Sequence, residues 1–207
     1  MSYLEYLNTY LKSELIEEME EDAKINKVPI ISKDSLSFLF MLIDLKKPKR
    51  ILEIGTAIGY CAINLASFDC DLIIDSIERD EALYNKAKVN VSKAKLEKRI
   101  NLYLADALTI DNNELKSYDL IFIDGAKAQY EKFFNKFKSL LKEGGIIVSD
   151  NLLFHNLLFE ENVSKNVKGL TDKIKKYNLF LKENEEFKTY FFQVGDGIGV
   201  SIRKWVN

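Results

Sequence analysis

Short apolar segments alternate with helical ones through the middle of the chain, and this alternation constrains the fold more than any other feature. Five apolar runs have the length of strands: "RILEIG" (50–55), "DLIIDSIE" (71–78), "INLYLAD" (100–106), "YDLIFID" (118–124) and "GGIIVSD" (144–150). Helical patterns lie between them at 59–68, 81–95 and 129–142. Continuous apolar strands that alternate with helices are typical of a parallel sheet covered on both faces. We therefore expect an α/β fold with a doubly wound sheet.

Further helices and a hairpin are expected at the two ends of the chain. Residues 3–26 have apolar residues at helical spacing, and a second helix is expected over 33–46, before Pro48. A polar helix is expected over 160–183, and "FKTYFFQV" and "GIGVSIRKW" are joined by Gly-Asp-Gly, which predicts a hairpin. The 207 residues suffice for one domain over 1–207. We expect N-terminal helices over 1–46 and a Rossmann-like core over 50–207, whose seven strands are mostly parallel and end in an antiparallel hairpin.

The composition excludes several classes of protein. Hydrophobic residues make up 47% and charged residues 30% of the chain, as in water-soluble globular proteins. Two cysteines without a CxxC or Cys/His cluster argue against a disulfide scaffold or a zinc site, and they fit the reducing cytosol, so a cytoplasmic protein is expected. The N-terminus lacks the pattern of a signal peptide, and no apolar run approaches the roughly 20 residues of a membrane span. No membrane partner is therefore expected.

Charge is spread unevenly along the chain. The net charge of -2 gives no overall basic field for nucleic acid. However, residues 13–22 carry six acids and no base, and residues 86–99 carry six bases against the single Glu97. Two solvated helix faces are the simpler interpretation. The alternative is that the basic segment 86–99 binds a polyanion.

An acidic residue stands at or near the end of each predicted parallel strand. In doubly wound sheets, ligands bind outside the carboxyl ends of the strands. A single acid there is commonly a helix cap, whereas five in succession suggest a polar site. These acids are Glu53, Glu78, Asp106, Asp124 and Asp150.

The first three strand ends fit an adenosine ligand. The turn "EIGTAIGY" places Gly55 and Gly59 four residues apart, so that the backbone can approach a ligand and aim helix N–H groups at it. Taken alone, this turn could equally be a packing feature. Glu78 follows about twenty residues later, where an acid accepts hydrogen bonds from ribose hydroxyls, and Asp106 could reach an adenine amino group. A turn that carries the carboxylate of Glu53 suits a cationic ligand, which favours S-adenosylmethionine over NAD.

The last two strand ends offer hard oxygen ligands. Asp124, Asp150 and Asn151 suit Mg²⁺ or another divalent cation. The alternative is that Asp150 and Asn151 cap a helix and Asp124 helps to bind the cofactor. Lys127 could deprotonate a substrate hydroxyl or hold its anion, or it could be a surface lysine. His155, the only histidine, is interpreted as a loop residue and substrate contact.

With these motifs the chain resembles the cation-dependent O-methyltransferases, the group that includes catechol and caffeoyl-CoA methyltransferases. The resemblance runs from about residue 28 to the C-terminus and is carried by "ILEIGTAIGY", "IERDE", "LADAL", "FIDGAKAQY", "GGIIVSDN" and "VGDGIGVS". Within the group, "VPII", "GTAIGY", "AKAQYEKFF" and "DNLLF" are similar to the bacterial tRNA 5-hydroxyuridine methyltransferases.

The resemblance implies roles for individual residues. A divalent cation would be bound by Asp124, Asp150 and Asn151, and the catalytic residues would be Lys127, beside the reacting oxygen, and Asp124. S-adenosylmethionine would contact a larger set: Leu36, Glu53, Gly55, Thr56, Gly59, Tyr60, Cys61, Glu78, Asp106, Ala107 and Asp124. Cys61 stands where relatives often have a serine, and a thiol is a weaker hydrogen-bond donor. The family also forms homodimers, often through N-terminal helices, so a homodimer is expected.

The expected reaction is methylation of 5-hydroxyuridine at the tRNA wobble position to 5-methoxyuridine. A cation that chelates two adjacent substrate oxygens would lower the pKa of the hydroxyl and orient it. Because a catechol offers the same pair of oxygens, methylation of a small catechol-like molecule is the alternative. Two rival interpretations are a non-catalytic nucleotide-binding Rossmann protein and an NAD dehydrogenase.

Overall fold

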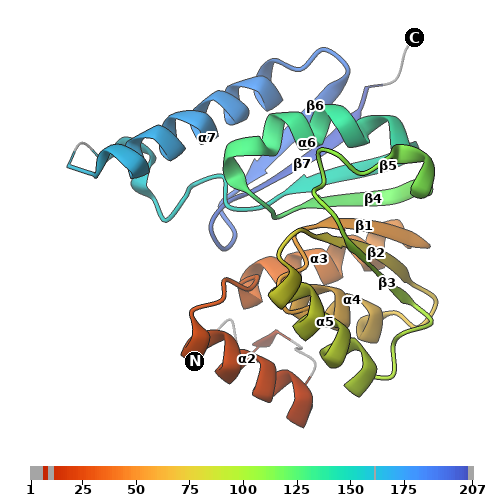
Figure 1. Ribbon diagram of the computed structural model, residues 1–207. Coiled ribbons are helices and arrows are strands. Elements are labelled where there is room, and N and C mark those ends of the chain that lie inside the picture. The colour runs from red at the N-terminus through yellow and green to blue at the C-terminus, as the bar shows by residue number, and fades with distance from the viewer. Residues whose placement is uncertain (1–6, 9–11, 161, 205–207) are drawn as a thin grey trace.

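The sheet has the expected seven strands. A computed structural model describes residues 7–8, 12–160 and 162–204. The strands follow the order β3-β2-β1-β4-β5-β7-β6 across the sheet. β1 to β5 are parallel, and β7 is antiparallel to both β5 and β6. This confirms the doubly wound sheet with a hairpin at one edge (Figure 1). The strands are β1 (Arg50–Ile54), β2 (Ile73–Glu78), β3 (Ile100–Leu104), β4 (Tyr118–Ile123), β5 (Leu141–Ser149), β6 (Phe187–Phe192) and β7 (Ile198–Arg203).

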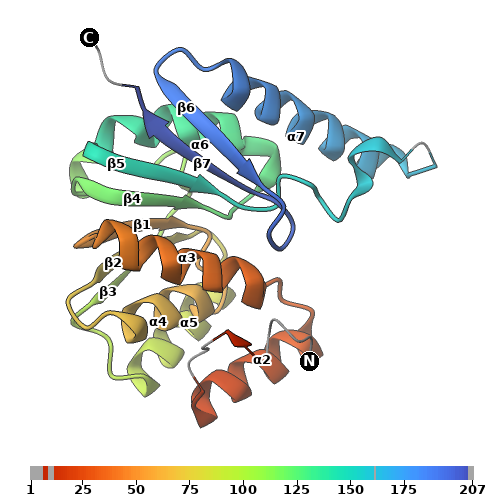
Figure 2. The ribbon, with the colours of Figure 1, turned by 180° about the vertical axis from the view of Figure 1, so that it is seen from behind.

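Helices lie on both faces of the sheet, as the continuous apolar strands require. Figures 1 and 2 show the arrangement from opposite sides. One apolar cluster joins the sheet to α2, α3, α4 and α5, and a second joins it to α6 and α7. The helices are α2 (Glu14–Asn26), α3 (Lys33–Lys46), α4 (Tyr60–Phe68), α5 (Glu81–Lys93), α6 (Tyr130–Phe137) and α7 (Lys165–Glu183).

Side-chain caps decide where several helices begin. The Ser13 hydroxyl accepts a hydrogen bond from the Ile16 N–H at 3.2 Å, so α2 begins at Glu14. The expected continuous helix over 3–26 is thus corrected, since Leu7 is helical but residues 12 and 13 are not, and residues 3–6 and 9–11 lie outside the described residues. Ser32 caps α3 at the expected position, whereas Ser164 makes α7 begin at Lys165 instead of at 160.

The boundary between α6 and β5 also differs from the expectation. α6 ends at Phe137 and is followed by the short 3-10 helix Lys138–Leu140, and β5 begins at Leu141 rather than at Gly144. An added Cβ on Gly145 would lie 2.9 Å from the Leu141 side chain and 3.0 Å from the Asp119 carbonyl oxygen. The glycine therefore lets β5 pass close to β4, and β5 extends to Leu141 because that residue pairs with Tyr118 before a shift in the register.

A buried carboxylate connects four strands. Asp75 in β2 is fully buried, and its side chain accepts hydrogen bonds from Arg50 at 2.9 and 3.0 Å. It also accepts hydrogen bonds from the Asn101 amide at 2.6 Å and from the Tyr118 hydroxyl at 2.8 Å. These contacts fix β1, β3 and β4 relative to β2, below the edge where the strands end.

The acidic helix α2 lies against the basic helix α5 of its own chain (Figure 1). Glu18 pairs with Lys93 at 3.0 Å, and Asp22 pairs with Lys86. Segments 13–22 and 86–99 are largely solvent-exposed, as the simpler interpretation expects, and these two ion pairs join their charged faces. Among the described helices, none combines the length and the apolarity of a membrane span.

Candidate functional site

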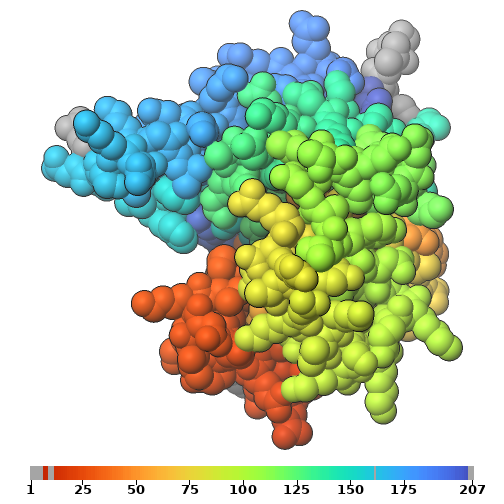
Figure 3. Space-filling model, in the orientation of Figure 1, coloured from red at the N-terminus to blue at the C-terminus, as the bar shows by residue number. Residues whose placement is uncertain are grey.

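A cavity of about 390 Å³ lies at the edge where the parallel strands end. Figure 3 shows the surface hollowed between the N-terminal segment and the segment after β5. Residues that follow each of β1 to β5 line the cavity, together with the connection between α2 and α3. The sequence-predicted site residues among the lining are Gly55, Thr56, Tyr60, Cys61, Glu78, Asp106, Ala107, Asp124, Lys127, Asn151 and His155.

The glycine turn after β1 brings two strand ends into contact. Gly55 has φ +105°, and an added Cβ would lie 2.6 Å from the Asp124 carbonyl oxygen. Gly59, with φ +84°, precedes the first residue of α4. Only glycine fits at position 55, because any side chain would collide with the backbone after β4. The turn therefore places the start of α4 beside the ends of β1 and β4.

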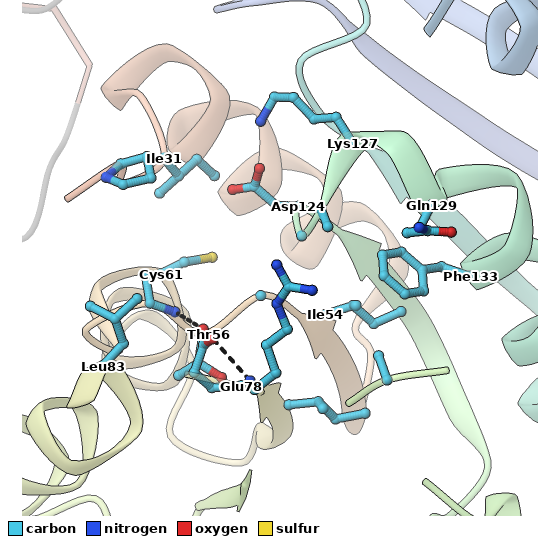
Figure 4. A pocket seen from close by; sticks show the side chains of 18 of the residues that line it. Ile31, Ile54, Thr56, Cys61, Glu78, Leu83, Asp124, Lys127, Gln129 and Phe133 are labelled. Atoms are coloured by element: carbon cyan, nitrogen blue, oxygen red, sulfur yellow. Dashed lines mark hydrogen bonds between the residues drawn. The ribbon is translucent and has the colours of Figure 1, made fainter. Parts of the chain in front are cut away.

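Glu78 connects the end of β2 to this glycine turn. Its carboxylate accepts the backbone N–H of Ala57 at 2.8 Å and those of Arg79 and Asp80 at 2.9 Å each. Since each carboxylate oxygen can accept more than one hydrogen bond, Glu78 can still accept from a ligand in the cavity. Figure 4 shows Glu78 with Thr56 and Cys61 on one side of the cavity, across from Asp124 and Lys127.

Glu53 lies beneath the cavity and does not line it. It is 1% exposed, and its Oε2 accepts a very short hydrogen bond from the Ser76 hydroxyl. Its Oε1 has no hydrogen-bond partner among the described residues. Burial raises the pKa of Glu53 from 4.5 to about 7, although the Ser76 hydrogen bond opposes the rise. Burial and the nearby Glu53 likewise raise the pKa of the Cys61 thiol, which faces the cavity.

Two further carboxylates lie close together at the other side of the cavity: Asp150 is buried, and Asp124 is partly buried and lines the cavity. Burial raises the pKa of Asp124 well above 3.8, and the negative charge of Asp150 raises it further. Asp150 is 1% exposed, and burial raises its pKa to about 6 even though it accepts hydrogen bonds from the Asn151 N–H at 2.7 Å and the Ser35 hydroxyl at 3.4 Å. The positive charge of Lys127 lowers both pKa values, and Figure 4 shows its amine pointing toward Asp124.

This charge pattern fits a divalent cation. Two neighbouring carboxylates repel each other, and a cation between them would offset that repulsion. Asn151 adds an amide, so the donors are hard oxygens of the kind that Mg²⁺ and Ca²⁺ take. Within the described part of the chain, no group of three or more His, Cys, Asp or Glu side chains is placed to hold a metal ion. A cation here would therefore depend on Asp124, Asp150 and the Asn151 amide.

The structure decides between interpretations that the sequence left open. Asn151 has φ +60° and begins a run of turns, and the next helical residues are Leu157–Phe159 with Asn156 at their N-cap. Neither Asp150 nor Asn151 therefore caps a helix. Lys127 lines the cavity instead of lying on an open surface, and His155 is a loop residue at the cavity rim.

Leu36, an expected cofactor contact, is not among the residues that line the cavity. It is 1% exposed and belongs to the apolar core. Residues 29–31, in the connection just before α3, line the cavity in its place. Gly59 and Asp150 are adjacent to the cavity but are not among its lining residues.

Some residues that line the cavity were not expected from the sequence. Arg79 directly follows Glu78, so its position after β2 could have indicated it, and Phe133 lies one turn into α6. Asp196 was recognised only as part of the Gly-Asp-Gly turn, although its side chain lies against Asn151 and His155. No local signal in the sequence shows this contact.

Comparison with known proteins agrees with the geometry of the site. The model of the O-methyltransferase family matches residues 5–204. The chain belongs to this family. Tapetum-specific methyltransferase 1 from Arabidopsis thaliana is 31% identical to this O-methyltransferase over 202 residues, which cover 92% of this chain and 86% of the relative. Caffeoyl-CoA O-methyltransferase from Populus kitakamiensis is 29% identical over 179 residues, 82% of this chain and 76% of the relative.

Solved structures show the same fold. A "putative caffeoyl-CoA O-methyltransferase" from Staphylococcus aureus superposes on this O-methyltransferase with a TM-score of 0.91 and 36% identity, and the match covers 98% of both chains. The SAH-bound methyltransferase PaMTH1 from Podospora anserina has a TM-score of 0.87 and 23% identity, and covers 98% of this chain and 93% of its own. The expected O-methyltransferase is confirmed, and the non-catalytic protein and the NAD dehydrogenase are set aside. The tRNA substrate stays a prediction.

Proposed function

We propose that the protein transfers a methyl group from S-adenosylmethionine to a hydroxyl of a small molecule that carries two adjacent oxygens, with the help of a divalent cation. One observation carries this proposal. A single cavity is lined on one side by the acids suited to an adenosine, Glu78 and Asp106, and on the other by Asp124 and Lys127, with the buried Asp150 directly adjacent.

Two kinds of observation support the binding of S-adenosylmethionine in this cavity: the chemistry of the carboxylates there, and the similarity to a solved methyltransferase structure. S-adenosylmethionine would supply a methyl group on a positively charged sulfur. Glu78 and Asp106 offer carboxylate oxygens to the ribose hydroxyls and the adenine amino group. Glu53 lies below Cys61 as a buried carboxylate with an unpaired oxygen, so a nearby cationic ligand would stabilise its charged form. A neighbour with the same fold is SAH-bound.

The carboxylates of Asp124 and Asp150 support the binding of a cation and of the acceptor hydroxyl at the other side of the cavity. A cation held by Asp124, Asp150 and Asn151 would, when bound, lower the pKa of an acceptor hydroxyl and orient it. Lys127 faces these carboxylates, so its positive charge can hold the negative charge of an acceptor oxygen. The residues at 29–31 and Phe133 add apolar side chains to the lining of the cavity.

Two observations favour a small molecule over tRNA as the acceptor. A relative at 29% identity is named for caffeoyl-CoA, whose caffeoyl group is a catechol. In addition, Lys86 and Lys93 of the basic segment 86–99 form ion pairs with the acidic helix α2. Fewer charges of that segment are therefore available to phosphates.

The test incubates purified protein with methyl-labelled S-adenosylmethionine, Mg²⁺ and either a catechol or tRNA that carries 5-hydroxyuridine. We expect cation-dependent methylation of the catechol, which EDTA abolishes. Labelling of the catechol that persists at full rate in EDTA would refute the cation. If only the tRNA is labelled, and this labelling falls steeply as the salt concentration rises, the small-molecule acceptor is refuted and tRNA is supported as the acceptor.

A further inference from the structure

The turn between β6 and β7, residues 193–197, reaches back to the segment that follows β5. Gly197, with φ +85°, lies so close to Leu153 that an added Cβ would be 2.6 Å from its Cγ and 3.0 Å from its backbone nitrogen. Gly195, with φ +55°, lies equally close to the hydroxyl of Ser35 in α3. The turn is therefore held between α3 and the segment that carries Asn151.

The side chain of Asp196, in the middle of this turn, binds that segment with both oxygens. Its Oδ1 accepts the backbone N–H of His155 at 2.5 Å, and its Oδ2 accepts the side-chain Nδ2 of Asn151 at 3.4 Å. The Asp196 backbone oxygen also accepts the Leu153 N–H at 2.9 Å. Asp196 is thus bonded to three residues of the segment that follows β5.

These contacts determine which end of the Asn151 amide is free. An ionised carboxylate can only accept hydrogen bonds, so the group of Asn151 that faces Asp196 must be the NH₂. The opposite orientation would place two acceptor oxygens against each other. With Nδ2 directed to Asp196, Oδ1 is the part of the amide left to bind a cation beside Asp124 and Asp150.

Asp196 also fixes the backbone around this amide. Asn151, Phe154, His155 and Asn156 have φ values of 60°, 46°, 56° and 59°, a region that residues other than glycine rarely adopt. Such a segment keeps its shape only when surrounding contacts hold it. Asp196 supplies contacts at its beginning, through Asn151, and near its end, through His155.

We propose that Asp196 is a positioning residue for the cation site. It fixes Oδ1 of Asn151 as the third oxygen donor beside Asp124 and Asp150, and it acts through this amide rather than as a cation ligand, since Asp196 is not among the residues that line the cavity. This inference rests on the proposed function, which assigns a divalent cation to this site.

The test measures binding of Mn²⁺ to cofactor-free protein by electron paramagnetic resonance, so that no turnover is needed. Asp196→Asn keeps the size of the side chain and leaves one acceptor in place of two. We expect Mn²⁺ to bind this variant about ten-fold more weakly or worse, as is typical when a group that orients a metal ligand is lost. The affinity for S-adenosylmethionine, measured by calorimetry, should stay within about two-fold, because Asp196 is not among the cavity-lining residues.

A matched control makes the same change elsewhere. Asp111 also accepts a backbone N–H in a turn, from Asn113 at 2.9 Å, after β3. Asp111→Asn should leave Mn²⁺ affinity unchanged. If Asp196→Asn weakens Mn²⁺ and S-adenosylmethionine binding equally, or lowers the melting temperature enough to explain both, its role is structural and the proposal fails.

A double-variant cycle tests the route through Asn151. In an Asn151→Ala background, Asp196→Asn should change Mn²⁺ affinity by less than about two-fold, because the amide that it orients is gone. The full weakening in that background would mean that the charge of Asp196 acts directly, which would overturn the proposal. Wild-type protein that binds no Mn²⁺ would refute the proposed cation itself. If the wild type binds Mn²⁺ and the Asp196→Asn variant binds it with the same affinity, only the role of Asp196 is refuted.

Discussion

Glu53 should make the stability of the cofactor-free protein depend on pH. The carboxyl group is 1% exposed, and burial raises its pKa from 4.5 to about 7. A carboxyl group whose pKa is higher in the folded than in the unfolded chain stabilises the fold while it is protonated. Its contribution is therefore fully present below pH 4.5 and is lost as the pH rises through 7. Glu53→Gln removes the titration, because glutamine is neutral throughout.

The size of the effect follows from the two pKa values. Each tenfold change in an acidity constant corresponds to about 1.4 kcal/mol. Integrated between pH 5 and pH 8, the rise from 4.5 to about 7 gives a loss of about 2–3 kcal/mol in the free energy of unfolding of the wild type. The variant should lack this loss, so its stability relative to the wild type should increase by the same amount over that range.

The assay is urea denaturation at pH 5, 6, 7 and 8 without cofactor or metal. The difference between the two proteins reports on Glu53 together with its effect on Asp124, whose pKa the charge of Glu53 raises, whereas Asp150 titrates in both. Glu143→Gln, at an exposed position, serves as the control and should follow the wild type within about 0.5 kcal/mol. A difference between Glu53→Gln and the wild type that changes by less than about 1 kcal/mol over this range would refute the reasoning.

Three other changes test the site and the sheet. Asp150→Ala should abolish catechol methylation while calorimetry still detects binding of S-adenosylmethionine; retained activity would contradict a role in cation binding. Gly55→Ala places a Cβ 2.6 Å from the Asp124 carbonyl oxygen at φ +105°, so it should cost more than about 2 kcal/mol of stability in urea denaturation and weaken cofactor binding. Asp75→Ala leaves Arg50 half-buried without its partner and should cost about 3–5 kcal/mol in the same assay, whereas an effect below about 1 kcal/mol would show that the network is not needed.

The sequence by itself determined the fold class and most of the cavity. Continuous apolar runs specify buried parallel strands, and the acids at their ends are brought to one edge of the sheet by parallel pairing. Asp124 and Asp150, at the ends of neighbouring strands, could therefore be predicted to lie close together, and they do. Gly55 could be recognised in the same way, because a tight turn between strand and helix is a local feature.

Only the tertiary structure decided which side chains from distant segments meet. Asp196 lies 45 positions from Asn151 in the chain, and nothing near either residue encodes their hydrogen bond. The pairing of α2 with α5 and the inward position of Leu36 likewise depend on how helices pack on the sheet. Periodicity and turn chemistry act over a few residues, whereas these contacts are fixed by packing the whole core. The residues at the strand ends could therefore be predicted from the sequence. The residues that hold their side chains in place could not.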